Sequence, residues 1–225
     1  MQIELVNRPS ATAALIHMTR GERFVAEPGA MIAMSTRFAL HTDTRGGGLL
    51  GGIKRMFSGE SFFLNTYEAQ DDGQELVLAP TLPGDIAVLP LRDERMLVQR
   101  GAWLGSTDGV SCTTTNQGLT VGLFGGQGLF WVACQGTGEV LVSTFGALYT
   151  IDVDGETLVD TSHVAAHQDT LKLSIGKANE SLLGSFVGGE GLVCRFQGRG
   201  RVWVQSHNPS DFGQAIGPLL PSRQG

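Results

Sequence analysis

A glycine motif near residue 46 has the spacing of a dinucleotide-binding loop. Gly46, Gly48 and Gly51 satisfy the pattern G-x-G-x-x-G, and Glu68 follows where an acidic residue would contact a ribose. Such a site needs the third glycine to open a helix whose amino terminus holds the pyrophosphate, whereas here an apolar strand is expected within about ten residues. The chain also contains no Gly-Lys-Ser or Gly-Lys-Thr of a phosphate-binding loop. We therefore predict no cofactor.

Two histidines, His163 and His167, have the spacing that places both imidazoles on one face of a helix, as in zinc proteases. The alignment of the repeats described below instead predicts a strand, in which four residues span roughly 13 Å. Two imidazoles at that separation cannot share one ion directly, and no glutamate completes an H-E-x-x-H pattern. We interpret them as surface or edge histidines and predict no metal site.

Three polar residues, Glu60, Gln127 and Glu190, occupy the same position in a glycine loop that occurs three times. They could converge on one axis and bind a ligand or an ion. They could also accept hydrogen bonds from the amides of their own loops, which we favour, because Gln127 replaces the acid in one copy and would weaken a site for a hard cation. We predict no catalytic residues, since no G-x-S-x-G motif is present and no spacing of serine, histidine and aspartate favours a triad.

One loop combines basic and apolar residues and is a candidate interaction loop. Its members are Leu49, Leu50, Lys54, Arg55, Met56 and Phe57. Such a loop could contact an anionic membrane or a protein partner, although two charges contribute only about 1 kcal/mol each near a lipid surface, too little for stable anchoring. A solvated loop is the alternative interpretation.

The three glycine loops lie in a repeated pattern that organises the whole chain. Residues 58–61, 125–128 and 188–191 each lead into an apolar run, at intervals of about 65 residues, which indicates a triplication. A repeat of this size, interrupted by glycine, is too small to close its own core, so the repeats must share one. We predict a single domain, 1–225, with repeats at approximately 1–75, 76–142 and 143–207 and a short C-terminal tail.

Turn residues mark the expected strand ends. Pro28-Gly29 and Pro83-Gly84 predict equivalent turns before apolar strands, and turns are also expected at 71–73, 136–138 and 198–200.

Three further features complete the expected elements. Asp154-Gly155 between alternating arms predicts a hairpin, and the second repeat carries an apparent insertion at 92–111. Residues 210–219 predict a short helix that Ser210 caps and Pro218 ends.

Composition favours an all-β chain. Glycine contributes 32 of 225 residues, about twice its average share, and charged residues make up only 17%. The net charge of −6 argues against nucleic-acid binding. We find no secretion signal and no long apolar run, and the odd set of Cys112, Cys134 and Cys194 lacks C-x-x-C spacing, so we expect a cytoplasmic protein without disulfides.

Glycine-rich stretches lie at 46–52, 125–130 and 188–192, with Lys54-Arg55 after the first of them and an apolar strand sequence at 202–206. Together they resemble the altered inheritance of mitochondria protein 24 family in its bacterial form. The resemblance covers roughly residues 1–207. It implies three similar β-units about a pseudo-three-fold axis, similar to the units of the tryptophan RNA-binding attenuation protein and distantly to double-stranded β-helices. Eukaryotic members are tied to mitochondrial organisation, bacterial members have no assigned activity, and the family supplies no catalytic residues.

The sequence therefore predicts a non-enzymatic scaffold or binding protein. Because a glycine-rich β fold with few charges exposes strand edges, we expect it to form a homo-oligomer. An unknown protein or a peripheral membrane surface could be a further partner, and no nucleic acid is expected. The alternative is a small-ligand-binding protein or an enzyme with a site at the repeat junction.

Overall fold

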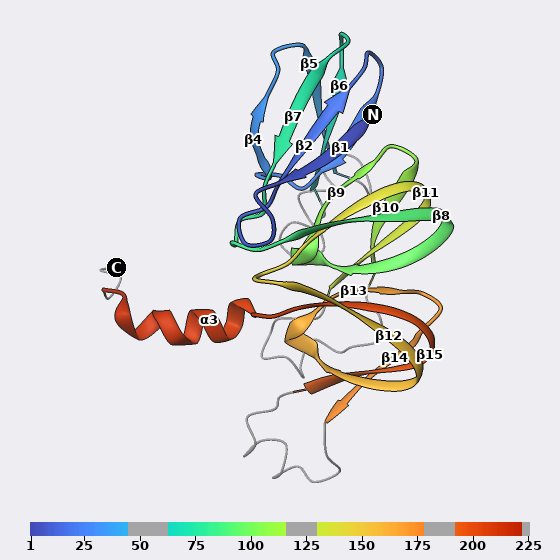
Figure 1. Ribbon diagram of the computed structural model, residues 1–225, viewed down its shortest axis with the longest axis vertical. Helices are drawn as coiled ribbons and strands as arrows, with labels where there is room; N and C mark the ends of the chain where they lie inside the picture. The colour runs from blue at the N-terminus through green and yellow to red at the C-terminus, as the bar shows by residue number, and fades with distance from the viewer. Residues whose placement is uncertain (45–62, 116–129, 178–191, 222–225) are drawn as a thin grey trace.

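The computed structural model describes residues 1–44, 63–115, 130–177 and 192–221 of the chain. Its sheets are built from antiparallel strand pairs, which confirms the predicted all-β class. The early, middle and late parts of the chain follow one another along the long axis of the molecule, and a short C-terminal helix projects to one side (Figure 1). In these ranges, no helix is both long enough and apolar enough to cross a bilayer.

The first segment of the chain, residues 1–78, forms seven strands. A four-stranded sheet has the order β1-β2-β7-β4, and β3-β6-β5 join the larger sheet. The Asp71-Asp72-Gly73 turn separates β6 from β7 as predicted, with Gly73 at a left-handed φ of 68°. The bounds of the strands are β1 Gln2–Val6, β2 Ala13–Met18, β3 Arg23–Ala26, β4 Met31–Met34, β5 Phe38–Thr44, β6 Phe63–Ala69 and β7 Gln74–Leu78.

The second segment, 86–143, and the third segment, 148–205, share one order of elements: a long strand, a 3-10 turn, two short strands and a second long strand. In both, the long strands pair along their whole length, and the short strands pair with the second long strand. The second segment consists of β8 Ile86–Gln99, η1 Arg100–Ala102, β9 Trp103–Thr107, β10 Val110–Thr115 and β11 Trp131–Ser143. The third consists of β12 Leu148–Asp160, η3 Thr161–His163, β13 Val164–Gln168, β14 Lys172–Lys177 and β15 Leu192–Gln205.

The hairpin predicted at Asp154-Gly155 is wrong. These residues lie inside the continuous strand β12, where Gly155 pairs with Gly198 of β15. The turns predicted at 136–138 and 198–200 also lie inside strands, β11 and β15. The positive φ of Gly155 (109°) and Gly198 (120°) lets the two paired strands bend together without reversing the chain.

Residues 92–111, predicted to be an insertion, are instead regular parts of the second segment. They contain the end of β8, then η1, β9 and the start of β10, each with a counterpart in the third segment. The prediction failed because it equated two turns that differ in position. The Pro83-Gly84 turn precedes β8, the first strand of its segment, whereas Pro28-Gly29 precedes the short strand β4.

The tail forms the predicted helix with a different cap. The helix α3, Pro209–Ile216, begins after Asn208, whose side-chain Oδ1 accepts a hydrogen bond from the amide of Asp211 at 2.8 Å. Pro209 occupies the first turn, where its missing N–H costs no hydrogen bond. A 3-10 turn, η4 Gly217–Leu219, follows.

The hydrophobic core combines residues from different segments. One cluster joins Val25 of the first segment to Trp103 of the second and Ala166 of the third. A second packs Phe24 and its neighbours against the start of the second segment, and a third packs Trp131 against the third segment. The described segments therefore bury their apolar faces against one another.

Neighbouring segments are also joined by strand pairing. Strand β9 pairs with β3, and β13 pairs with β8. Strands β4 and β12 lie at opposite ends of the molecule (Figure 1), so these described pairs form an open row of segments. The pseudo-three-fold axis that the resemblance implies is not confirmed by this arrangement.

The buried carboxylate of Asp85 stabilises the junction between the first and second segments. Asp85 accepts two hydrogen bonds from the guanidinium of Arg8, at 3.0 and 2.7 Å, and one from the hydroxyl of Thr12 at 2.8 Å. Its Oδ1 also accepts from the amide of Ile86 at 2.9 Å, where β8 begins. Burial raises the pKa of Asp85, but these hydrogen bonds and the Arg8 charge outweigh it and hold the pKa below its ordinary value.

Candidate functional site

The loop residues that the sequence singled out lie outside the described residues. These are Leu49, Leu50, Lys54, Arg55, Met56 and Phe57 of the candidate interaction loop, together with Glu60, Gln127 and Glu190 of the polar set. Both candidates stay predictions. Of the glycine motif, only Glu68 is described, and its carboxylate accepts a hydrogen bond from Arg23 at 2.7 Å across the β3–β6 pair.

The two histidines lie on different elements. His163 ends η3, where its Nδ1 lies 2.7 Å from the carbonyl oxygen of Gln205. His167 is fully buried in β13 between the rings of Trp131 and Phe196, with ring centroids 5.0 and 5.2 Å away. Burial lowers the pKa of His167, which favours the neutral imidazole. The interpretation of His167 as a surface or edge histidine is therefore wrong, because the pairing of β13 between β15 and β8 places it in the core.

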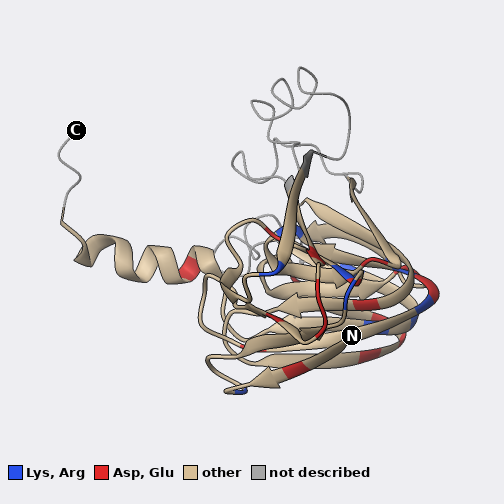
Figure 2. Ribbon diagram, turned by 90° about the horizontal axis from the view of Figure 1, so that it is seen from above, with Lys and Arg blue, Asp and Glu red and all other residues tan. Residues whose placement is uncertain are grey.

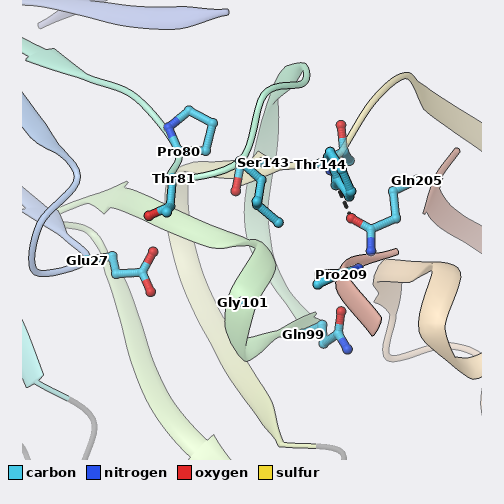
Figure 3. Close-up of a pocket in the computed structure, with 11 residues that line it drawn as sticks. Glu27, Pro80, Thr81, Gln99, Gly101, Ser143, Thr144, Gln205 and Pro209 are labelled. Carbon is cyan, nitrogen blue, oxygen red and sulfur yellow. Dashed lines mark hydrogen bonds between the residues drawn. The ribbon is translucent and has the colours of Figure 1, made fainter. Parts of the chain in front are cut away.

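A pocket of about 500 Å3 lies where the three segments meet. Glu27 contributes from the turn after β3, Gln99 from the end of β8, Ser143 from the end of β11 and Gln205 from the end of β15. Figure 3 shows the Glu27 carboxylate on one side of the pocket and Gln205 and Pro209 on the other. The sequence allowed a site at a repeat junction, but the residues that it named for one, Glu60, Gln127 and Glu190, lie outside the described residues.

Several polar side chains of the pocket form hydrogen bonds within the fold. The side-chain oxygen of Gln205 accepts from the amide of Phe145 at 3.0 Å, and its nitrogen donates to the carbonyl of Ser162 at 3.1 Å. Ser143 donates its hydroxyl to the carbonyl of Ala102 at 3.3 Å. These hydrogen bonds stabilise the ends of the long strands, so the groups that form them have a structural role.

Glu27 is the chemically distinctive group of the pocket. Within the described part of the chain, its carboxylate has no hydrogen-bond partner. Burial raises the pKa of the Glu27 carboxyl to about 7, and the nearby positive charge of Arg100 only partly opposes this. A carboxyl with this pKa exchanges its proton near neutral pH and can either donate or accept a hydrogen bond.

The raised pKa of Glu27 predicts a specific dependence of stability on pH. Because the folded state retains this proton above the ordinary carboxyl pKa, the free energy of unfolding should fall as pH rises from about 4.3 to about 7. Glu27→Gln removes the charge with little change of shape. After allowance for partial exposure, we expect this variant to be more stable than the wild type by about 1 kcal/mol at pH 8 and similar to it at pH 4.

Urea denaturation of the two proteins at pH 4, 6 and 8 measures this difference. Glu94→Gln, a change at an exposed glutamate of β8, is the control and should show no such divergence. Equal stability of Glu27→Gln and wild type across this range would show that the Glu27 carboxylate is well solvated.

A second feature is the apolar outer edge of β4. All four residues of β4 are exposed, including Met31 (37%), Ile32 (61%) and Met34 (39%). The corresponding short strands β9 and β13 are almost entirely buried. Apolar residues on an unpaired strand edge are typical of sites where another strand adds.

The far end of the molecule carries a second unpaired edge, on β12. Acidic and basic residues are scattered over the strands (Figure 2), and the first part of β12 forms ion pairs with β15. These pairs are Asp152–Arg201, Asp154–Arg199 and Glu156–Arg195. Beyond them the edge becomes apolar, and the side chain of Leu158 is 44% exposed.

Sequence reasoning missed both Glu27 and these edges. Glu27 directly follows the apolar run Phe24–Ala26, and an acid at the end of a buried strand could have been singled out. The edges had no comparable signal. The sequence of Met31–Met34 predicts an apolar strand, and only the pairing of distant strands shows that its outer side has no partner among the described residues.

Comparisons with known proteins cover nearly the whole chain. A family model described as Mitochondrial biogenesis AIM24 matches residues 3–207. An uncharacterised protein of Streptococcus pyogenes serotype M6 is 33% identical over 215 residues, which make up 92% of this chain and 86% of that protein. The crystal structure of another Streptococcus pyogenes protein, 29% identical, matches with a TM-score of 0.80 over 97% of this chain and 99% of that chain.

Proposed function

Since this chain belongs to the Mitochondrial biogenesis AIM24 family, we propose that it is a non-enzymatic binding protein that associates with copies of itself. The membership confirms the resemblance noted in the sequence. The single observation that carries the proposal is the exposed outer edge of β4, whose counterparts in the other segments are paired and buried.

The pairing of the short strands supports three related units. Strand β4 pairs with β7, β9 with β11 and β13 with β15, each through the same one-residue register shift, at Met31/Ala33, Trp103/Gly105 and Val164/Ala166. The same number of residues also separates the first strand from the short strand in each unit, from Val25 to Met34, from Leu97 to Ser106 and from Leu158 to His167. Positions in the three units can therefore be equated residue by residue.

Light scattering over a concentration series tests the proposal. We expect a particle whose mass is a multiple of 23.9 kDa at micromolar concentration, with dissociation on dilution. An edge strand with apolar side chains gains both backbone hydrogen bonds and apolar burial when another strand adds to it. A mass of 23.9 kDa throughout the micromolar range would contradict self-association.

The second candidate function is binding of a small ligand in the pocket at the segment junction. Glu27 favours it, because a half-buried carboxyl with a pKa of about 7 is the kind of group that enzymes and binding sites use. The structural engagement of Ser143 and Gln205 argues for the binding protein instead. A ligand that raises the melting temperature of the wild type but not of Glu27→Gln would favour the pocket.

A further inference from the structure

Each short strand inside the chain lies between two partners. Strand β9 pairs with β11 of its own segment and with β3 of the segment before, and β13 pairs with β15 and with β8 in the same way. Strand β4 pairs with β7, which corresponds to β11 and β15, but it has no second partner among the described residues. A strand that corresponds to β3 and β8 is missing at this edge.

The end of β12 is the matching element without a partner. The ends of β3 and β8 each pair with the short strand of the next segment, whereas the equivalent side of β12 has no partner among the described residues. Its pairing within the described chain is with β15, on its other side. Strand β4 thus lacks a partner at one end of the molecule, and the end of β12, which is the kind of strand that could pair with it, lacks a partner at the other end.

Burial shows what the missing contact would cover. Ser106 and His167 are fully buried where they pair with Val25 and Leu97, which are 3% and 0% exposed. Their equivalents at the two free edges are Met34, 39% exposed, and Leu158, 44% exposed. These two positions are therefore buried at the junctions between segments, whereas at the two ends of the molecule they are exposed and carry apolar side chains.

Strands β5, β10 and β14 do not show this mismatch. Each has one partner among the described residues, but they occupy equivalent positions in the three segments, so a single partner is the rule for them. Strand β1 also pairs on one side, with β2, and corresponds to no described strand of the other two segments. The earlier part of β12 carries the charged residues Asp152, Asp154 and Glu156, which discourage strand addition. Residues 157–159 near the end of β12 carry no such charge, and the next residue, Asp160, ends the strand and caps η3.

We propose that β4 of one copy pairs antiparallel with the end of β12 of a second copy. This inference rests on the proposed function and identifies its partner surface. The register follows from the internal pairs Ser106↔Val25 and His167↔Leu97 and places Met34 opposite Leu158. The neighbouring pairs are Ala33 with Val159 and Ser35 with Thr157.

The contact joins two different surfaces, so it is head-to-tail. After the first contact forms, one copy keeps a free β12 end and the other keeps a free β4, and further copies add until a ring closes or a filament grows. The proposed pair has the same geometry as the β3–β9 and β8–β13 pairs that join segments within the chain. The assembly therefore extends the row of segments from one molecule to the next.

Cross-linking of single-cysteine variants tests the register. Met34→Cys and Leu158→Cys are prepared separately, one with an affinity tag, then mixed and treated with a short thiol-specific cross-linker. Opposite residues in an antiparallel pair have Cβ atoms about 5 Å apart, within reach of such a reagent. We expect tagged–untagged dimers, with a yield on the order of tenfold above that of either variant alone, because association raises the local thiol concentration.

The native cysteines provide the background for this experiment. Cys112, Cys134 and Cys194 are buried, so the wild type should give little product. Leu40→Cys, at a 47% exposed position on β5, is the matched control and should not cross-link to Leu158→Cys.

The outcomes separate the inference from the proposed function. Self-cross-linking of Met34→Cys alone would show symmetric β4–β4 pairing and overturn the head-to-tail contact. A multimeric mass by light scattering without Met34–Leu158 cross-links would overturn the register while leaving self-association intact. A particle of 23.9 kDa would overturn both.

Discussion

Asp85→Ala is expected to destabilise the fold by about 3 kcal/mol, the largest effect that we predict for a single substitution. The change leaves the hydroxyl of Thr12 and the amide of Ile86 without the acceptor that they have in the buried junction. It also leaves the guanidinium of Arg8 without its carboxylate, although this group is half exposed and can be partly rehydrated. Urea denaturation at pH 7 measures the loss.

The effect should depend on pH in a defined direction. Because the fold lowers the pKa of Asp85, its contribution is fully present above the ordinary carboxyl pKa of about 3.9 and is lost as pH falls through the lower folded value. Wild type and Asp85→Ala should therefore converge in strong acid. Asp154→Ala, which removes the exposed ion pair with Arg199, is the control and should cost less than about 1 kcal/mol. Equal costs at the two sites would show that the Asp85 network does not fasten the junction.

Local sequence signals predicted the class of the fold and some of its turns. The turn at Asp71-Asp72-Gly73 and the tail helix are formed by neighbouring residues, so composition and short motifs were sufficient. The hairpin at Asp154-Gly155 failed because the same dipeptide also permits a bend within a strand. The pairing of Gly155 with Gly198, which is distant in sequence, determines which of the two forms.

The candidate site was harder to predict for the same reason. Glu27 and Gln205 lie far apart in the sequence, and they line the same pocket only because the segments pack together at their strand ends. The exposed edge of β4 is equally non-local, since Met34 resembles any apolar strand residue until its equivalents Ser106 and His167 are seen to be buried. The glycine loops attracted attention because they repeat, but repetition alone does not distinguish a binding site from a shared turn.

Met34→Glu is expected to weaken self-association by about two orders of magnitude while leaving the protomer folded. The position is exposed in the single chain, so the free energy of unfolding of the protomer should change by less than about 0.5 kcal/mol. In the assembly the new carboxylate would face Leu158 and lie on the same face of the strand pair as Glu156 and Asp160, so it would meet like charges. Leu40→Glu, on the edge strand β5, is the control and should associate like the wild type.

Hydrogen exchange at the two free edges tests the central claim most directly. In the wild type, peptides covering 31–35 and 157–160 should become more protected together as protein concentration rises, while a peptide covering 38–42 of β5 should not change. Met34→Glu should remove the concentration dependence from both segments. If the two segments in the wild type exchange at the same rates at every concentration, the edges of β4 and β12 are not joined and the account is wrong.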